Sequence, residues 1–516
     1  MTHFLNLKSG KPELHQRIAD RLGRRWLGFD SRWLIVVLIL ATVLRLYQIG
    51  QRSLWFDEAI SALSVRFNWQ LILSQRIDPL APPLYYLLLH FWMLALAGIG
   101  APSNEVVLRS FSAVWSVAAI GPVYALGQHM FNRKTGIVAA LLMALLPFQI
   151  TYAQEARSYS LVIFCSAFML WALVRALDYD RGRDWLSVFV ISALGLYINY
   201  ILALPLIVFH IYALFLPTRW RLVRRLLLVD AALAMSLLPL VPDLLQQSQQ
   251  LSAAAYKLAR PTLLTPLVTF TFLQFGYVTE SIILTGFALF VTLAILILLM
   301  LPVIRQVSRR RMDGRTLLLL EILLPPFIMV VLSFLIQPVY YDRWFAFITP
   351  ALAIFVAQGI SARPTGLYRV LLLALFGLTI IRLTGYYTQP DQSRPPFREA
   401  SAYIVAHAQP GDVVLHLHDS TYPSFRFYAP EIQACLWQDD VAGWLVPAAW
   451  KWFGARCSDL SVLFEGHARI WVMSLPDTLD DSRRALESQI EARYPKVGEM
   501  RFDNVAVALY AAAPKK

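Results

Sequence analysis

Residues 33–62 read WLIVVLILATVLRLYQIGQRSLWFDEAISA, an apolar run that leads directly into a polar segment. The run ends without a small-residue cleavage site, so we predict an uncleaved signal anchor. The polar segment carries two adjacent carboxylates, Asp57 and Glu58, close to the end of the run. Charges at the edge of the hydrocarbon are costly and need partners or a function. This stretch therefore indicates a membrane fold and a first candidate for the functional site.

The composition of the chain agrees with a membrane fold. Of its 516 residues, 58% are hydrophobic and 15% are charged, whereas soluble domains are about 45–50% apolar and about 25% charged. This excludes an ordinary soluble enzyme, and the high aromatic content excludes a disordered chain. The formal net charge is +13. Nucleic-acid binding is one explanation of that excess, but Lys and Arg in cytoplasmic loops explain it better.

The apolar runs predict a polytopic α-helical membrane protein with about eleven transmembrane helices. We expect residues 1–32 to form a cytoplasmic N-terminal segment and residues 33–387 to form the transmembrane domain. The candidate spans are 33–50, 106–127, 136–152, 158–177, 186–199, 200–217, 226–243, 281–303, 316–336, 344–360 and 369–387.

One more apolar run, 84–98, decides the side of every later loop. If it does not cross, the loops placed inside carry more than twice as many Lys and Arg residues as the longer outer loops. If it crosses, the basic segments 218–225 and 304–315 lie outside, against the positive-inside rule. The run is also shorter than the ~20 residues that a span needs. We therefore predict a non-crossing helix, a cytoplasmic N-terminus and an extracytoplasmic C-terminus.

The outer loops are expected at 51–105, 152–157, 244–280 and 337–343. Within the first of them, Ile60, Leu63, Phe67 and Leu71 recur at helical spacing, with polar residues opposite. This pattern predicts an amphipathic helix that lies on the membrane surface.

After residue 387 the composition changes to that of a soluble domain. A Pro-rich polar linker precedes alternating helix and strand patterns, which predict a small extracytoplasmic α/β domain at 388–516. Cys435 and Cys457 fall in this domain, where oxidation is possible, but spacing alone leaves a disulfide between them undecided. His416 and His418 alternate on a predicted strand and are expected to share a solvated face.

The charged residues of the outer loops are the candidate site. The acidic ones are Asp57, Glu58, Asp78 and Glu155, and the basic ones are Arg157, Lys257, Arg260 and Arg343. Each has a simpler explanation, because Asp57 could cap a helix, Glu155 could pair with Arg157, and Arg343 could snorkel from a helix end. Their convergence at the lip of a membrane cavity favours a function. Carboxylates beside guanidinium groups suit glycosyl transfer from a lipid-linked sugar phosphate, because one group accepts a proton and the other stabilises phosphate.

The chain also resembles the membrane-embedded GT-C glycosyltransferases, in particular the bacterial branch related to protein O-mannosyltransferases and lipid A aminoarabinose transferases. The resemblance rests on RLYQIGQRSLWFDEAISA (45–62), APPLYYLLLHFW (81–92) and residues 108–161, and it returns at YYDRWFAFITPALAI (340–354). It implies a GT-C fold at the cell (inner or plasma) membrane, a polyprenyl-phosphate-linked sugar as donor, and a lipid, glycan or protein as acceptor.

By this resemblance Asp57 matches the catalytic aspartate, Glu155 the second acidic position and Arg343 a phosphate-facing arginine. Arg157, Lys257 and Arg260 are further candidates for phosphate binding, and Glu58, Asp78 and Tyr85 are candidates for the substrate cavity. The family often has His before the two prolines where this chain has Ala81, so no role is carried over to that position. Some members bind a divalent cation at the two acidic positions and others need none, so Asp57 and Glu155 could together hold one.

The leading hypothesis is an inverting glycosyltransferase that acts outside the cytoplasm. The alternative is a non-enzymatic transporter or flippase of lipid-linked sugars. Transporters place charges near the middle of the bilayer and contain inverted repeats, and neither feature is evident here. A third hypothesis, that the C-terminal domain is the working part and the bundle its anchor, conflicts with the large number of predicted spans.

Overall fold

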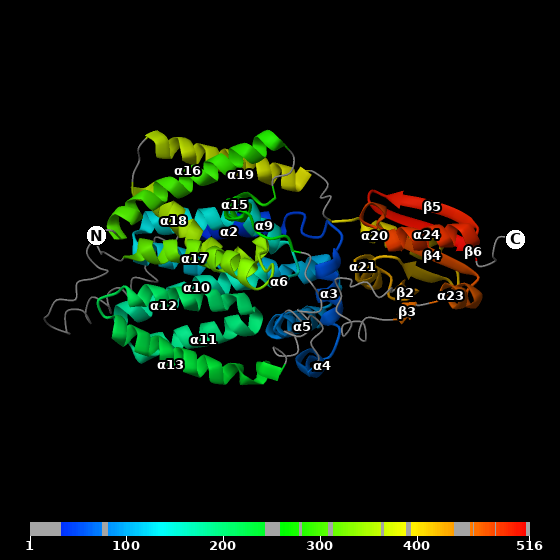
Figure 1. The fold of residues 1–516 in the computed structure, drawn as a ribbon, viewed down its shortest axis with the longest axis horizontal. Helices are drawn as coiled ribbons and strands as arrows, with labels where there is room; N and C mark the ends of the chain where they lie inside the picture. The colour runs from blue at the N-terminus through cyan, green and yellow to red at the C-terminus, as the bar shows by residue number, and fades with distance from the viewer. Residues whose placement is uncertain are drawn as a thin grey trace.

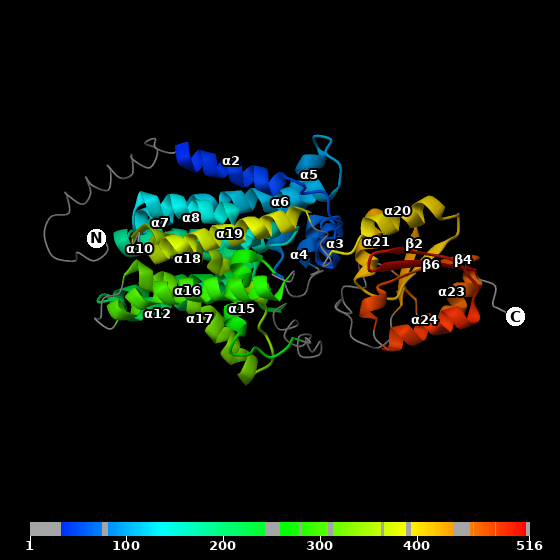
Figure 2. The same ribbon diagram turned by 90° about the horizontal axis from the view of Figure 1, so that it is seen from above.

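The computed structural model has two parts that lie end to end, a bundle of long helices and a smaller domain with a mixed sheet (Figure 1). It describes residues 32–74, 81–242, 258–277, 281–307, 313–362, 366–388, 394–437, 455–457, 459–479 and 481–511. Helix α2 (Arg32–Leu46) begins at the end of the bundle far from the sheet domain, and α19 (Gly366–Thr388) ends beside that domain (Figures 1 and 2). The two ends of the transmembrane region thus lie at opposite faces of the bundle.

The bundle contains several helices that fit a bilayer. Within the described residues, six helices are long and apolar enough to cross a membrane, and the bent pair α8–α9 raises the number to 7. A multi-pass helical fold is thus confirmed, while about eleven crossings stays a prediction. Besides α2 and α19, the helices are α6 (Glu105–Ala118), α7 (Ile120–Met130), α8 (Arg133–Leu145), α9 (Pro147–Ala153), α10 (Tyr159–Tyr179), α11 (Gly182–Ile198), η1 (Tyr200–Leu202), α12 (Ala203–Leu214), α13 (Arg219–Leu237), η2 (Leu238–Leu240), α15 (Thr265–Phe275), α16 (Ile282–Val307), α17 (Gly314–Leu335), η3 (Asp342–Ile348) and α18 (Thr349–Ala362).

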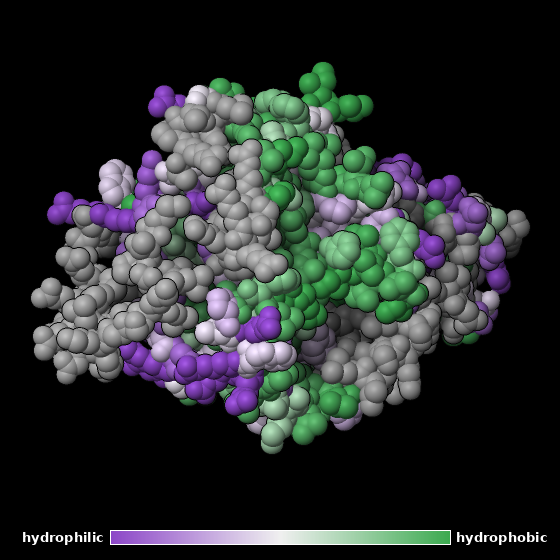
Figure 3. Space-filling view, turned by 60° about the vertical axis from the view of Figure 1, so that its left-hand side comes forward, coloured by the Kyte–Doolittle hydropathy of each residue, from purple (hydrophilic) through white to green (hydrophobic). Residues whose placement is uncertain are grey.

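The surface of the bundle is apolar where lipid would cover it. Large hydrophobic side chains such as Trp33, Ile39, Phe290 and Leu373 are exposed. In Figure 3 a broad band of hydrophobic side chains lies between hydrophilic patches on either side. Contiguous apolar surface of this extent marks an interaction site, and on a bundle of this hydropathy the partner is the bilayer.

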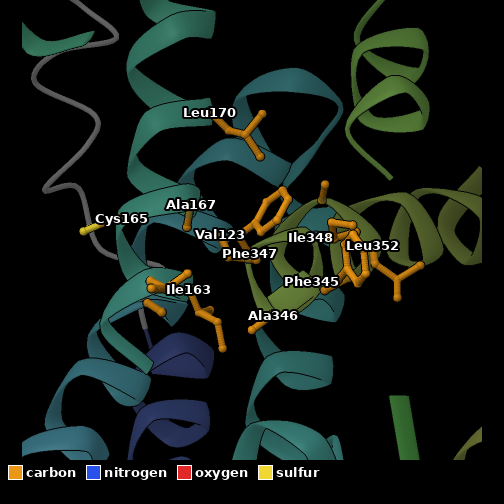
Figure 4. Close-up of a cluster of buried hydrophobic side chains, with 14 of the residues drawn as sticks. Val123, Ile163, Cys165, Ala167, Leu170, Phe345, Ala346, Phe347, Ile348 and Leu352 are labelled. Atoms are coloured by element: carbon orange, nitrogen blue, oxygen red, sulfur yellow. The ribbon is translucent and has the colours of Figure 1, made fainter. Parts of the chain in front are cut away.

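The centre of the bundle is closed by the short helix η3. Its residues Phe345, Ala346, Phe347 and Ile348 are fully buried and lie among side chains of α7 and α10 (Figure 4). The Ser166 hydroxyl donates to the Phe347 carbonyl oxygen at 2.6 Å, which satisfies a buried backbone acceptor. This packing fixes the start of η3, where Arg343 lies.

A break between α8 and α9 turns the chain towards the candidate site. The two helices meet at 57°, and the break falls at Pro147, which has no amide hydrogen for the carbonyl group of Met143. The buried Arg45 guanidinium supplies the missing donors, at 2.8 Å from the Met143 oxygen and 3.1 Å from the Ala144 oxygen. The loop that contains Glu155 follows directly after α9.

The predicted non-crossing helix is α5 (Leu84–Ala97). Its 14 residues rise only ~21 Å, less than the ~30 Å of a hydrocarbon core. It lies with α3 (Phe56–Ser64) and α4 (Trp69–Ser74) at the end of the bundle that faces the sheet domain (Figure 1). Its length therefore agrees with a helix that does not span the membrane.

The predicted amphipathic surface helix differs from the observed structure. The chain forms two helices, α3 and α4, with a break at residues 65–68. Every residue of α3 from Glu58 to Ser64 is buried, and Ile60 and Leu63 pack into the core of the sheet domain. The apolar stripe of α3 is therefore covered by protein rather than by lipid, because the C-terminal domain docks against it.

The C-terminal domain is a three-layer α/β structure. Its sheet has the order β3-β2-β1-β4-β6-β5, in which β3, β2, β1 and β4 are parallel and β6 is antiparallel to both of its neighbours, β4 and β5. Helix α20 lies on one face, and α23 and α24 lie on the other (Figure 2). The elements are α20 (Phe397–His407), β1 (Val413–His416), α21 (Thr421–Tyr428), β2 (Gln433–Trp437), β3 (Ala455–Cys457), α23 (Leu460–Gly466), β4 (Arg469–Ser474), η4 (Pro476–Thr478), α24 (Asp481–Arg493), β5 (Lys496–Phe502) and β6 (Val505–Ala511).

The expectation that His416 and His418 share a solvated face is wrong for His416. This ring is fully buried, and its Nδ1 lies 2.8 Å from the Thr421 hydroxyl. Burial lowers the pKa of His416 to about 3, so the ring is neutral. The strand end is covered by α21, which a single-strand pattern does not reveal.

Cys435 of β2 and Cys457 of β3 form a disulfide, which settles the question that spacing left open. Their Cα atoms are 5.7 Å apart, within the range that a disulfide requires. The bridge joins an edge strand to its neighbour and closes a long connection between them.

We expect non-reducing peptide mapping of the full chain to recover Cys435 and Cys457 in one cross-linked fragment. Cys457→Ala should lower the stability of the C-terminal domain by about 3 kcal/mol, because an unbridged chain gains entropy on unfolding. Cys165→Ala is the matched control, since Cys165 is a buried free thiol, and it should leave the cross-link intact. Free Cys435 in protein isolated from an oxidising compartment would contradict the assignment.

Candidate active site

Asp57 lies in the first turn of α3 between two guanidinium groups. Arg343 Nη1 is 3.1 Å from Asp57 Oδ2, and Arg157 Nε is 3.9 Å from the same oxygen. The Asp57 side chain is 22% exposed, which leaves it accessible to a substrate. The three side chains come from α3, from η3 and from the loop before α10, so the fold brings together residues far apart in the sequence.

Glu58, the neighbour of Asp57, is fully buried in an ion pair with Arg109. Arg109 Nε and Nη2 each donate to a Glu58 carboxylate oxygen at 2.7 Å. The backbone N–H of Ala156 also donates to Glu58 at 2.9 Å. Burial alone would raise the pKa of Glu58, but Arg109 and Arg394 hold it below its usual range. Glu58 therefore stays ionised and ties α3 to α6 and to the loop before α10.

Glu155 is the second acidic group of the site. Arg394 Nη2 lies 3.5 Å from its Oε2, and its Oε1 is buried and accepts no hydrogen bond from the part of the chain that the structure describes. Burial raises the pKa of Glu155 to about 7, although Arg394 and Arg343 act in the opposite direction. Near neutral pH this group can therefore hold or release a proton, as an acid–base group must.

The simpler explanations of these charges do not describe the structure. The N-cap of α3 is Trp55, and Asp57 is the second residue of the helix, so it does not cap it. Glu155 pairs with Arg394, and Arg157 is directed to Asp57. Arg343 is only 15% exposed and is directed to Asp57, so it is not a snorkelling residue.

The remaining predicted residues are less closely associated. Tyr85 is buried on α5 and interacts electrostatically with Arg157, Glu58 and Glu155. Arg260 is exposed. Glu58 lies beneath the accessible surface, and so the structure places it in the framework of the site. Asp78 and Lys257 fall outside the described residues.

Two residues of the site escaped the sequence reasoning. Arg109 is a charged residue inside an apolar run, and that is a signal of a functional or paired position. Arg394 belongs to the polar linker, where an arginine is unremarkable, so no signal in the sequence could have identified it.

A divalent cation at Asp57 and Glu155 stays a prediction. Within the described residues, no group of three or more His, Cys, Asp or Glu side chains could hold a metal ion. A cation at these two carboxylates would need further oxygen ligands from substrate or water.

Comparison with known proteins supports the resemblance found in the sequence. Residues 81–245 match the model of the dolichyl-phosphate-mannose-protein mannosyltransferase family. A comparison with curated protein sequences finds no match.

Solved structures share the fold over nearly the whole chain. The apo structure of ArnT from Cupriavidus metallidurans has a TM-score of 0.63 at 13% identity and covers 94% of this chain and 99% of that one. The same protein bound to undecaprenyl phosphate has a TM-score of 0.62 at 12% identity, with 95% and 100% covered. The archaeal oligosaccharyltransferase AglB from Archaeoglobus fulgidus, in complex with an inhibitory peptide and a dolichol-phosphate, has a TM-score of 0.50 at 14% identity, with 94% and 75% covered.

The chain therefore has the fold of the membrane-embedded GT-C glycosyltransferases. Within it, the segment 81–245 carries the sequence pattern of the mannosyltransferase family. That segment includes Arg109, Glu155 and Arg157, so three residues of the site lie in the region that both comparisons cover.

We expect the Arg109–Glu58 pair to be essential for stability. Arg109→Met leaves a buried carboxylate without its main partner, and loss of one member of a buried pair costs about 3–5 kcal/mol. Thermal unfolding of the detergent-solubilised full chain should therefore shift to a markedly lower temperature.

The matched control is Arg501→Met, which removes an ion pair with Glu499 in which the arginine is 68% exposed. A pair at the surface contributes about 1 kcal/mol or less. Equal unfolding temperatures for Arg109→Met and Arg501→Met would refute the structural role of the buried pair.

Proposed function

We propose that the protein is an inverting glycosyltransferase that moves a sugar from a polyprenyl-phosphate donor to an acceptor hydroxyl on the extracytoplasmic side of the membrane. One observation carries the proposal: the partly exposed carboxylate of Asp57 lies between the guanidinium groups of Arg343 and Arg157. Such a group of charges serves both ends of a glycosyl transfer, namely proton removal from the acceptor and stabilisation of the departing phosphate.

In the proposed reaction the oxygen of the acceptor hydroxyl attacks the anomeric carbon, and Asp57 accepts the proton of that hydroxyl. The bond between that carbon and the phosphate oxygen breaks, and the polyprenyl phosphate leaves with the electron pair. Attack from the face opposite the phosphate inverts the anomeric configuration. Arg343 and Arg157 neutralise the charge on the leaving phosphate, and Glu155 assists beside them.

The class of donor is supported by the comparisons. One similar structure was solved with undecaprenyl phosphate and another with a dolichol-phosphate. A long isoprenoid tail is compatible with the apolar surface of this bundle, and a phosphate head group is compatible with the arginines of the site. Lys257 and Arg260 are proposed as further phosphate ligands on the loop before α15.

The extracytoplasmic side is supported by two features. The Cys435–Cys457 disulfide belongs to a domain that docks against α3, beside the site, and disulfides persist in oxidising compartments. The basic segments 128–136 and 218–225, where α7 gives way to α8 and where α13 begins, lie at the other end of the long helices, and basic segments at the ends of spans favour the cytoplasm. We therefore propose a cell membrane location with the site facing outwards.

We expect the purified full chain to cleave a radiolabelled polyprenyl-phosphate sugar and transfer the label to an acceptor in membrane extracts. Asp57→Asn should lower the rate by about 10²–10⁴-fold, the usual contribution of an acid–base group. Chromatography of the released polyprenyl phosphate and of the labelled acceptor measures both products.

Asp503→Asn is the matched control. Asp503 lies in the C-terminal domain at a positive φ, which asparagine also tolerates, and this variant should keep the wild-type rate. Transfer at an undiminished rate by Asp57→Asn would remove Asp57 from the mechanism. Movement of intact donor across vesicle membranes without cleavage would instead indicate a flippase.

A further inference from the structure

The chain that enters the C-terminal domain passes through the candidate site. Arg394 lies between α19 and α20, and its side chain is only 5% exposed. Its Nη1 is 3.3 Å from Glu58 Oε2, and its Nη2 is 3.5 Å from Glu155 Oε2. One guanidinium group therefore bridges two buried carboxylates from different parts of the bundle.

This bridge reduces the electrostatic cost of burying two carboxylates in the site. Two buried carboxylates repel each other, and each is costly to bury unless it is paired. Arg109 occupies one side of Glu58, and Glu155 forms an ion pair with Arg394. Arg394 is thus a cation in direct contact with both carboxylates.

The position of Arg394 is fixed by the C-terminal domain. Four residues further on, Arg398 Nη2 lies 2.6 Å from Glu105 Oε1 and donates to the Gly50 carbonyl at 2.8 Å. Tyr428 of α21 donates to Glu105 at 2.7 Å and accepts from the backbone N–H of Leu54 at 2.7 Å. These contacts hold α20 and α21 against the start of α6 and the loop that precedes Asp57.

We propose that Arg394 is a positioning residue of the transferase site. The C-terminal domain fixes the position of Arg394, and Arg394 holds Glu155 and Glu58 in place. The proposal rests on the proposed function for its effect on turnover. The soluble domain is then an integral part of the site, in addition to any contact that it makes with an acceptor.

Other charged and titratable groups also act on Glu155, and they determine what the test must separate. Arg343 reduces the cost of its charge, whereas Asp57 and Glu58 increase it. Among the described residues, the groups that interact with Glu155 include Asp57 and Glu58 of α3, Tyr85 of α5, Tyr152 of α9, Tyr159 of α10, Tyr277, Arg343 of η3 and Arg394. A double-mutant cycle between Arg394 and Glu155 isolates the one pair of interest.

The experiment compares Arg394→Gln, Glu155→Gln and the double variant of the full chain. We expect Arg394→Gln to lower kcat by about tenfold or more, because groups in direct contact couple by a factor of this order. KM for the polyprenyl-phosphate sugar should change by less than about twofold, since Arg343 and Arg157 remain. In the Glu155→Gln background, loss of Arg394 should lower kcat by less than about threefold.

Arg398→Gln is the matched control, because it loosens the same segment without touching Glu155. Its effect on kcat should multiply with that of Glu155→Gln, so that the second cycle shows no coupling. Arg394→Lys keeps the charge but cannot bridge two carboxylates as a planar fork does, and it should recover part of kcat. If Arg394→Gln does not fold, the same cycle is run with Arg394→Lys.

A thermal-unfolding cycle on the same variants separates the two proposals. If Arg394 holds Glu155, then Glu155→Gln should recover part of the stability that Arg394→Gln loses, even in a protein that transfers no sugar. Coupling in unfolding without any turnover by wild type would refute the proposed function and keep the assignment of Arg394. Additive effects of Arg394→Gln and Glu155→Gln, in kcat and in unfolding, would overturn the assignment.

Discussion

The buried ion pair between Arg109 and Glu58 determines the arrangement of the site. Arg109 also donates to the carbonyl oxygens of Ile49, Arg52 and Ser53, so one guanidinium group holds the whole turn between α2 and α3. Burial of two such charges is favourable only when nearly all of their hydrogen-bonding capacity is used, and here it is. The direction of α3 follows from this pair, and with it the direction of Asp57.

The parts of the fold that depend on local patterns could be predicted from the sequence. The helix at 397–407, the buried strands around 413–416 and 469–474, and the last helix and strand all follow from periodicity. Strand β3 has only 3 residues, and nearly all side chains of β5 are exposed, so the sequence predicts neither of them. A strand without a buried face leaves no alternating pattern to read.

The site could be predicted where a charge stands in an unfavourable place. Asp57 and Glu155 were found because they lie at the ends of apolar runs, and Arg109 could have been found in the same way. The surroundings of α3 could not be predicted, because an apolar stripe shows that something covers the helix and not what covers it. Arg394 could not be found either, since its role depends on contacts with residues more than two hundred positions away.

The path of the chain through Arg394 also bears on how such a protein can evolve. A boundary drawn at the linker separates two folds, but it does not separate two functions, because the guanidinium group on one side balances carboxylates on the other. A soluble domain acquired from another protein would have to bring a cation to the same point or leave Glu155 without this ion pair. The two parts are therefore expected to be inherited together, as a single unit of selection.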